Sequence, residues 1–233
     1  MKKISLAAFV REILREFSKE KSQQDKDITK VIQKVALRSH EIEAYFEELA
    51  SKSHASFSKI KTVNIENENW VRAVSIDYAK KPLSYQGSLL SNSRFGQSGQ
   101  PTLYLAENHD VAAREVQFPE YFQATTLFGI KVNLQFILDL SGTKSLANYK
   151  VLTNLFVGEW KKFNNLGIKF YTQYLSDYLR TLPIEGFIYQ SNQSEKNRCL
   201  CIFPDKLVKG SSLAVHGTYK EIHKEDLTII AQI

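Results

Sequence analysis

Apolar side chains recur at helical spacing through the first fifty residues of the chain. Between residues 5 and about 19 they fall at i, i+3, i+4 and i+7, and Ser5 is a suitable N-cap. A second stretch, from about residue 27 to 50, repeats the pattern less regularly near Ser39-His40. The pattern predicts a helical hairpin whose second helix bends or breaks there. Because apolar stripes must be buried, the hairpin either packs on the rest of the chain or docks another protein.

From about residue 51 the apolar runs become shorter and richer in aromatic and β-branched residues. This pattern is typical of short strands mixed with short helices. It predicts strands at 70–74, 103–106, 128–134, 136–140, 186–189, 199–203, 213–219 and 227–230, and helices at 110–118, 146–163 and 171–182. Because strands and helices do not alternate regularly, the pattern favours an α+β fold. We expect a helical extension over residues 1–55 and a mixed-sheet domain over residues 56–233.

Composition and charge narrow the class of protein. The chain has 233 residues, of which 43% are hydrophobic and 24% charged, as in ordinary globular proteins. The net charge of +6 is spread evenly along the chain, so a dedicated nucleic-acid-binding role is not expected. The apolar run at the N-terminus stops at Arg11-Glu12 without a cleavage site, and no run approaches the ~18 residues that span a bilayer. We therefore predict a cytoplasmic protein that does not bind membranes.

The cysteines support the same compartment. Cys199 and Cys201 stand two positions apart, so in a strand they face the same side and rarely form a disulfide bond with each other. Two free thiols suit a reducing compartment. Asp, Glu, His and Cys do not cluster at the spacing of metal ligands, so no metal site is predicted.

The most informative stretch lies between residues 92 and 120. Arg94 stands before a loop rich in Gly, Ser and Pro, and Tyr104 begins a short strand. Glu107 lies just before the helix that follows, and Glu115 lies within this helix. A guanidinium forks onto phosphate, an aromatic ring stacks on a planar ring, and a carboxylate accepts from a ribose hydroxyl. The stretch predicts a ligand that carries phosphate, ribose and an aromatic ring. The alternatives are a solvated charge at Arg94 and a core aromatic at Tyr104.

Three stretches, in this order, resemble the RES domain family, which is named for its Arg, Glu and Ser. They are Trp70-Val71-Arg72-Ala73-Val74; Arg94-Phe95 with the loop, Tyr104-Leu105-Ala106-Glu107 and Ala112-x-x-Glu115-Val116; and Gly186-Phe187-Ile188-Tyr189-Gln190-Ser191 with Asn197 and Phe203-Pro204. The resemblance extends from about residue 66 to 209. Where the family often has Gly-Gly before the Arg and Asn two residues after it, this chain has Asn92-Ser93 and Gly96.

The resemblance implies a fold similar to that of ADP-ribosyltransferase toxins. It also implies a toxin of a bacterial toxin–antitoxin pair that cuts the nicotinamide–ribose bond of NAD, with water or phosphate as acceptor. NAD is then a substrate, and no bound cofactor is expected. The implied roles are that Arg72 and Arg94 hold the diphosphate, Tyr104 stacks on nicotinamide or adenine, Glu115 stabilises the oxocarbenium ion, Ser191 hydrogen-bonds the nicotinamide ribose or amide, and Asn197 supports the hairpin.

Several alternatives stay open. The same residues suit an ADP-ribosyltransferase that modifies a protein or nucleic acid, and the fold suits a non-catalytic binding module. Arg72 could form a structural salt bridge and Ser191 could only begin a turn. Glu107 is expected to cap the helix or face solvent, and His109 to be a loop histidine. The resemblance further implies a helical DNA-binding antitoxin as partner, and the extension could support a homodimer.

Overall fold

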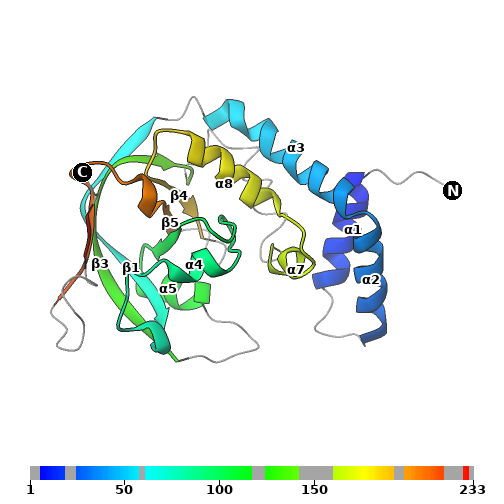
Figure 1. The fold of residues 1–233 in the computed structure, drawn as a ribbon, viewed down its shortest axis with the longest axis horizontal. Helices are drawn as coiled ribbons and strands as arrows, with labels where there is room; N and C mark the ends of the chain where they lie inside the picture. The colour runs from blue at the N-terminus through cyan, green and yellow to red at the C-terminus, as the bar shows by residue number, and fades with distance from the viewer. Residues whose placement is uncertain are drawn as a thin grey trace.

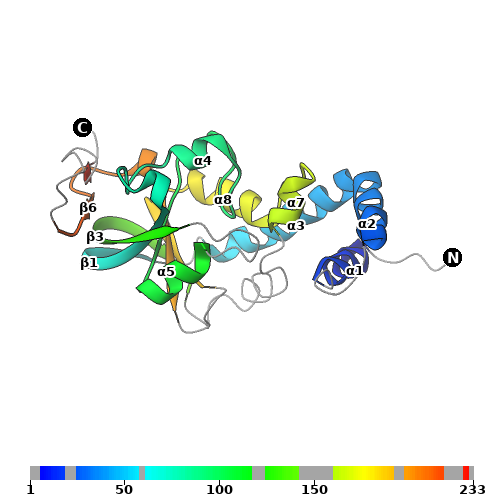
Figure 2. The same ribbon diagram turned by 90° about the horizontal axis from the view of Figure 1, so that it is seen from below.

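The computed structural model describes residues 6–18, 25–57, 61–116, 124–141, 160–191, 197–217 and 228–230. In Figure 1 the N-terminal helices lie at one end of the molecule and the sheet lies at the other. Helices α3 and α8 run alongside each other between these ends, as Figure 2 also shows. The expected α+β class, with helices preceding a mixed sheet, is confirmed.

The N-terminal extension contains three helices among the described residues: α1 (Leu6–Ser18), α2 (Asp25–Leu37) and α3 (Ser39–Phe57). The first predicted helix is confirmed, and the second is divided at Arg38, next to the irregularity in its pattern. The amide of Arg38 bonds the carbonyl of Val35, and its guanidinium binds the carboxylate of Glu41. The break predicted near Ser39-His40 is therefore confirmed, and it gives the extension three described helices where the pattern predicted a hairpin of two.

The apolar stripes of these helices are buried within the chain. Phe46 of α3 is fully buried, and its ring centroid lies 5.2 Å from that of Phe163 and 5.0 Å from that of Phe170. Phe163 belongs to α7 (Trp160–Asn165), and Phe170 directly precedes α8 (Tyr171–Thr181). The extension therefore packs on the domain that follows, as the first of the two alternatives predicted.

The described strands form a seven-stranded sheet in the order β1-β2-β5-β4-β3-β6-β7. The strands are β1 (Thr62–Ser75), β2 (Leu103–Ala106), β3 (Thr125–Asp139), β4 (Gly186–Gln190), β5 (Arg198–Ile202), β6 (Ser212–Val215) and β7 (Thr228–Ile230). Because β1 also pairs with β3, the strands β1, β2, β5, β4 and β3 close into a ring. The β3–β4 pair is parallel, and the other pairs are antiparallel.

The predicted strands and helices differ from the observed ones at specific points. β1 begins well before the predicted strand at 70–74, and the strands predicted at 128–134 and 136–140 are one strand, β3. β6 ends at Val215, before the predicted end of its strand. Residues 146–159 of the helix predicted at 146–163 lie outside the described residues, and α7 covers the rest of it. Short elements that the pattern did not predict are η2 (Ile76–Tyr78), α4 (Gln86–Leu90) and η3 (Pro204–Lys206).

The two faces of the ring bury separate apolar clusters. One cluster includes Trp70, Ile130 and Leu200. The other includes Phe187 and Cys201 and is covered by α5 (His109–Val116) and α8. We call this side the helix-covered face. Gly186 is required there, because a Cβ at this position would lie 2.2 Å from the carbonyl oxygen of Cys201.

Candidate functional site

Arg94 lies on the helix-covered face and is almost fully buried, with 9% of its surface exposed. Its guanidinium carbon is 4.9 Å from the ring centroid of Phe95 and 5.3 Å from that of Tyr189. The Phe95 ring in turn contacts the rings of Phe187 and Tyr189. The Arg94 guanidinium is therefore a buried charge next to aromatic rings. In such a setting it attracts an anion more strongly than it would in bulk solvent.

Glu115 approaches the same face from α5. Its Oε1 accepts a hydrogen bond of 2.8 Å from Ser191 Oγ, and the Cys199 thiol donates to the same oxygen at 3.8 Å. The backbone N–H of Ser191 donates to the carbonyl of Asn197 at 2.8 Å, which closes the β4–β5 hairpin. The structure thus joins the helix-borne carboxylate to the end of this hairpin through one buried serine.

The electrostatics link Arg94 and Glu115 to the same two neighbours. Burial, followed by the charge of Glu115, raises the pKa of the Cys199 thiol to about 12, and Arg94 acts in the opposite direction. The pKa of Tyr189 is likewise raised, first by burial and then by Cys199 and Glu115, with Arg94 again opposing. Cys199 and Tyr189 therefore stay neutral at physiological pH, and the thiol of Cys199 is unreactive.

Tyr104 has a role that the sequence did not reveal. Its hydroxyl accepts a hydrogen bond of 3.0 Å from the Phe95 amide and bonds Ser93 Oγ at 2.8 Å. Burial raises its pKa, so the hydroxyl keeps its proton. Tyr104 therefore anchors the segment that carries Arg94, while stacking of its half-buried ring on a ligand stays a prediction.

Arg72 takes a different position. The alternation along β1 puts it on the side of Trp70 and Val74, whose cluster is the one away from α5 and α8. Its Nη2 donates to the carbonyl of Ser84 at 2.7 Å, and its Nη1 is buried without a hydrogen-bond partner among the described residues. Burial lowers its pKa to about 10. The structure brings together Arg94, Tyr104, Glu115 and Ser191, but it does not add Arg72 to that group.

The two remaining candidates, Glu107 and His109, lie at the start of α5 and bind neighbouring protein side chains. Glu107 binds Arg198 through Nη2 at 2.8 Å, Nε at 3.1 Å and the backbone N–H at 2.9 Å. Burial raises its pKa, but these bonds outweigh that effect and lower it. Asn108 caps α5 by accepting from the Val111 backbone N–H, so Glu107 is not the cap; its side chain is 34% exposed and forms an ion pair with Arg198. His109 is exposed and lies 3.4 Å from Asp110.

Two polar residues of α8 also belong to the site, and the sequence did not single them out. Thr172 Oγ1 donates to the carbonyl of Arg94, and Gln173 Nε2 donates to the carbonyl of Ser93 at 2.9 Å. Both side chains are buried. The sequence signal was weak: a Thr-Gln pair at the start of the helix, with Asp177 and Arg180 on the same face as Gln173.

The described residues lack two features. They contain no group of three His, Cys, Asp or Glu side chains arranged to hold a metal ion. Within the same ranges, no helix has both the length and the apolar character needed to cross a membrane.

Comparisons with known proteins concern the family and the fold. The model of the RES domain family matches residues 69–224. A chain in the crystal structure of the M. tuberculosis MbcT–MbcA toxin–antitoxin complex superposes with a TM-score of 0.54 at 15% sequence identity, covering 72% of this chain and 89% of that one. At this identity the likeness is one of fold. No curated protein sequence matches the chain significantly.

Proposed function

Because the chain belongs to the RES domain family, we propose that it is an enzyme that consumes NAD by cleaving the nicotinamide–ribose bond. The observation that carries the proposal is the convergence of a buried guanidinium, Arg94, and a serine-bound carboxylate, Glu115, on the helix-covered face. The two charges suit the two ends of the reaction. One matches an anionic diphosphate, and the other matches a ribose that becomes positively charged.

The chemistry needs little more than these charges. Nicotinamide is a cationic leaving group in NAD, and the electron pair of the breaking C–N bond leaves with it to give neutral nicotinamide. The ribose carbon becomes oxocarbenium-like, and the Glu115 carboxylate stabilises that developing charge. An oxygen of water or phosphate then bonds to the same carbon, and an attacking water loses a proton. NAD is a substrate here, not a resident cofactor.

The remaining side chains hold the reacting groups. Ser191 donates to Glu115 and so fixes the direction in which the carboxylate points. Arg94 binds the diphosphate, and its two aromatic neighbours keep the guanidinium plane in place. Fixing the diphosphate fixes the scissile bond relative to Glu115, which lowers the entropy cost of reaction. Ring stacking by Tyr104 and hairpin support by Asn197 belong to the same proposal. A diphosphate contact by Arg72 does not, because the alternation along β1 puts this side chain on the side of Trp70 and Val74, away from Arg94 and Glu115.

The biological setting that we propose is a toxin–antitoxin pair. The support is family membership and the fold shared with a chain from a toxin–antitoxin complex. The partner would be a helical, DNA-binding antitoxin. Because depletion of NAD harms any cell that makes the enzyme, a partner that blocks the helix-covered face would be needed during synthesis.

The test is to incubate the purified full-length protein with NAD, with and without phosphate, and to identify products by mass. Nicotinamide with ADP-ribose indicates hydrolysis, and nicotinamide with phosphorylated ADP-ribose indicates phosphorolysis. Nicotinamide release that requires a macromolecule, with a matching mass gain on it, indicates an ADP-ribosyltransferase. If the folded protein releases no nicotinamide under any of these conditions, the proposed activity is wrong, and NAD binding alone would then favour a binding module.

A further inference from the structure

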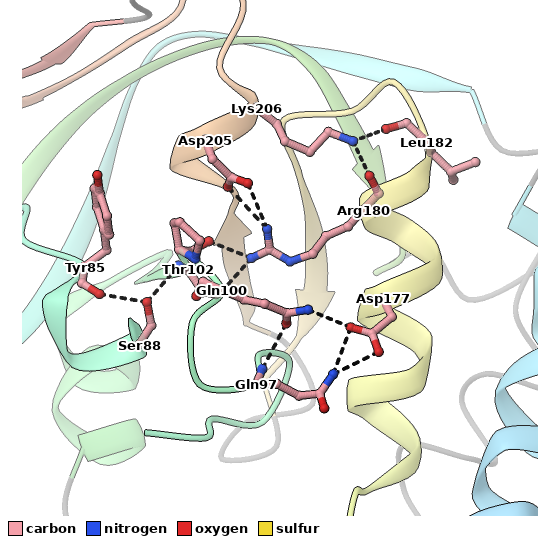
Figure 3. A network of polar contacts seen from close by, with 11 residues as sticks. Tyr85, Ser88, Gln97, Gln100, Thr102, Asp177, Arg180, Leu182, Asp205 and Lys206 are labelled. Carbon is pink, nitrogen blue, oxygen red and sulfur yellow. Dashed lines mark hydrogen bonds and ion pairs between the residues drawn. The ribbon is translucent and has the colours of Figure 1, made fainter. Parts of the chain in front are cut away.

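The segment that carries Arg94 is held by one side of α8. We call residues 93–102 the Arg94 loop. Gln173, Asp177 and Arg180 stand at i, i+4 and i+7, so they share one face of the helix. Figure 3 shows Asp177 and Arg180 projecting from α8 toward the side chains of this loop. Gln173 is satisfied at both ends, because its Oε1 accepts from the Phe170 amide and its Nε2 donates to the loop.

Asp177 is the point at which the loop side chains converge. Its Oδ1 accepts from Gln100 Nε2 at 2.8 Å, and its Oδ2 accepts from Gln97 Nε2 at 3.0 Å. The ammonium of Lys169 binds the same carboxylate. Gln100 Oε1 also accepts from the backbone N–H of Gln97 at 2.9 Å, so the two glutamines form one unit. Bonds to an ionised acceptor are stronger than neutral ones, so this carboxylate is the strongest attachment of that unit to α8.

Arg180 holds the end of the same loop. Its Nη2 donates to the Pro101 carbonyl at 2.6 Å and to Thr102 Oγ1 at 2.8 Å. Its Nη1 binds Asp205 of η3 at 3.2 Å, and its guanidinium lies 4.1 Å from the ring centroid of Phe203. Figure 3 shows the Arg180 guanidinium beside Thr102 and the carboxylate of Asp205, with Asp177 next to Gln97 and Gln100. The loop is thus tied to α8 at its beginning, middle and end.

The opposite side of α8 is itself fixed. His54 of α3 stacks on Tyr178 of α8, with ring centroids 3.7 Å apart and planes 11° apart. Ala50 of α3 is buried in the same apolar cluster as Leu175 and Leu179. Since α8 cannot follow a moving loop, its polar side chains can set the position of that loop.

We propose that Asp177 is a positioning residue that acts through Arg94. By holding Gln97 and Gln100, it keeps the Arg94 loop in the conformation in which the Arg94 guanidinium lies over Phe95 and Tyr189. The ligand in this inference rests on the proposed function, in which Arg94 binds the NAD diphosphate. The loop contains Gly96 and Gly99, and Gly99 has a φ of 89°. A loop with such freedom must be ordered before it binds, and prior order saves that cost in affinity.

The proposal predicts a split between binding and chemistry. Asp177→Ala should weaken NAD binding about tenfold, a coupling within the range of contacting residues. The rate constant at saturating NAD should change less than about twofold, because Glu115 is untouched. Binding is measured by calorimetry in the Glu115→Gln background, so that NAD is not consumed. The double variant Gln97→Ala/Gln100→Ala should reproduce the loss, and it removes no buried group of α8.

The decisive comparison is a double-mutant cycle with Arg94. In an Arg94→Ala background, Asp177→Ala should cost no further NAD affinity. Lys206→Ala is the matched control, because Lys206 donates to the carbonyls of Arg180 and Leu182 at the end of α8 but does not touch the loop. It should leave NAD affinity unchanged. An equal loss of affinity from Asp177→Ala with and without Arg94 would overturn the proposal.

A second measurement does not involve NAD. Amide hydrogen exchange over residues 93–102 should be faster in Asp177→Ala, and in the double glutamine variant, than in the wild type or Lys206→Ala. Unchanged exchange in these residues would refute the positioning role. If exchange rises while the wild type neither binds nor cleaves NAD, the control of the loop by Asp177 stands and the proposed function is the part that fails.

Discussion

Ser191 Oγ donates a 2.8 Å hydrogen bond to Glu115 Oε1, although the two residues are 76 positions apart in the chain. Ser191 directly follows the strand β4, and Glu115 lies in the last turn of α5. The bond fixes the direction of the carboxylate, and a neutral hydroxyl donor does not cancel its charge. A carboxylate held in this way needs no rearrangement when positive charge develops beside it.

Glu115→Gln should nearly abolish NAD consumption while the fold is retained. Glutamine has the same shape, and its side-chain oxygen can accept from Ser191, but it lacks the charge that stabilises an oxocarbenium ion. We expect a loss of about 3 kcal/mol or more in transition-state stabilisation, or about a hundredfold in rate. The assay is nicotinamide release, with circular dichroism as the check on folding. Near wild-type turnover in a folded variant would remove Glu115 from the mechanism.

Arg94→Lys should not be conservative. The guanidinium carbon lies 4.9 and 5.3 Å from the ring centroids of Phe95 and Tyr189, and the guanidinium can fork onto phosphate, which an ammonium cannot do. NAD affinity should fall by roughly 1.5–3 kcal/mol, the worth of a hydrogen bond to a charged group. Calorimetry measures this, with Arg114→Lys, an exposed position in α5, as the matched control. Equal affinities in the two variants would make Arg94 a structural residue.

The sequence predicted the fold best where one periodicity held throughout an element. β2 matches its predicted range, and α8 differs by one residue, because each has an uninterrupted apolar face. β3 was predicted as two strands because its alternation changes phase: Leu134 is buried, Phe136 is exposed and Ile137 is buried. The register with β1 shifts at this point, which identifies a bulge and not a strand end.

The site was predictable only as far as the family pattern reaches. That pattern singled out Arg94, Glu115 and Ser191, which the structure brings to one face. It could not reveal the hydroxyl of Tyr104 beneath the loop, nor the contacts from α8. Those contacts join residues about 80 positions apart, and they depend on which way each side chain points after the helix has packed.

Removing residues 1–54 should lower stability sharply. Phe46 fills a space between Phe163 and Phe170, and its loss alone would be expected to cost about 3–5 kcal/mol. The shortened protein should aggregate or change its oligomeric state, while its folded fraction keeps measurable NAD cleavage. Size-exclusion chromatography with light scattering, followed by the NAD assay, measures both. A stable, unchanged assembly without activity would show that the extension contributes directly to catalysis.

Acidification should loosen the contact between α3 and α8. Burial lowers the pKa of His54 below its ordinary value of 6.5, so the fold favours the neutral imidazole. Its contribution is complete above pH 6.5 and is lost as the pH falls through the lowered value. The measurement is the fall in Tm between neutral pH and about pH 5.5, in the wild type and in His54→Gln. Because the ring is partly exposed, the fall in the wild type should be larger by at most about 4 °C. Equal losses in both proteins would remove His54 as the cause.

Glu185→Gln should destabilise the fold without a direct effect on the chemistry. Glu185 is fully buried, and its Oε2 accepts from the amides of Gln135 and Phe136 at 2.6 and 2.9 Å, while its Oε1 accepts from the Val208 amide at 3.0 Å. The carboxylate thus satisfies the N–H groups that the bulge in β3 leaves unpaired. A glutamine must turn its NH₂ group toward at least one of these donors, which should cost about 1–3 kcal/mol. Thermal unfolding should fall by several degrees, roughly 2–4 °C per kcal/mol, whereas the exposed control Glu66→Gln should not change it. An unaltered Tm in Glu185→Gln would mean that water, not this carboxylate, satisfies the bulge.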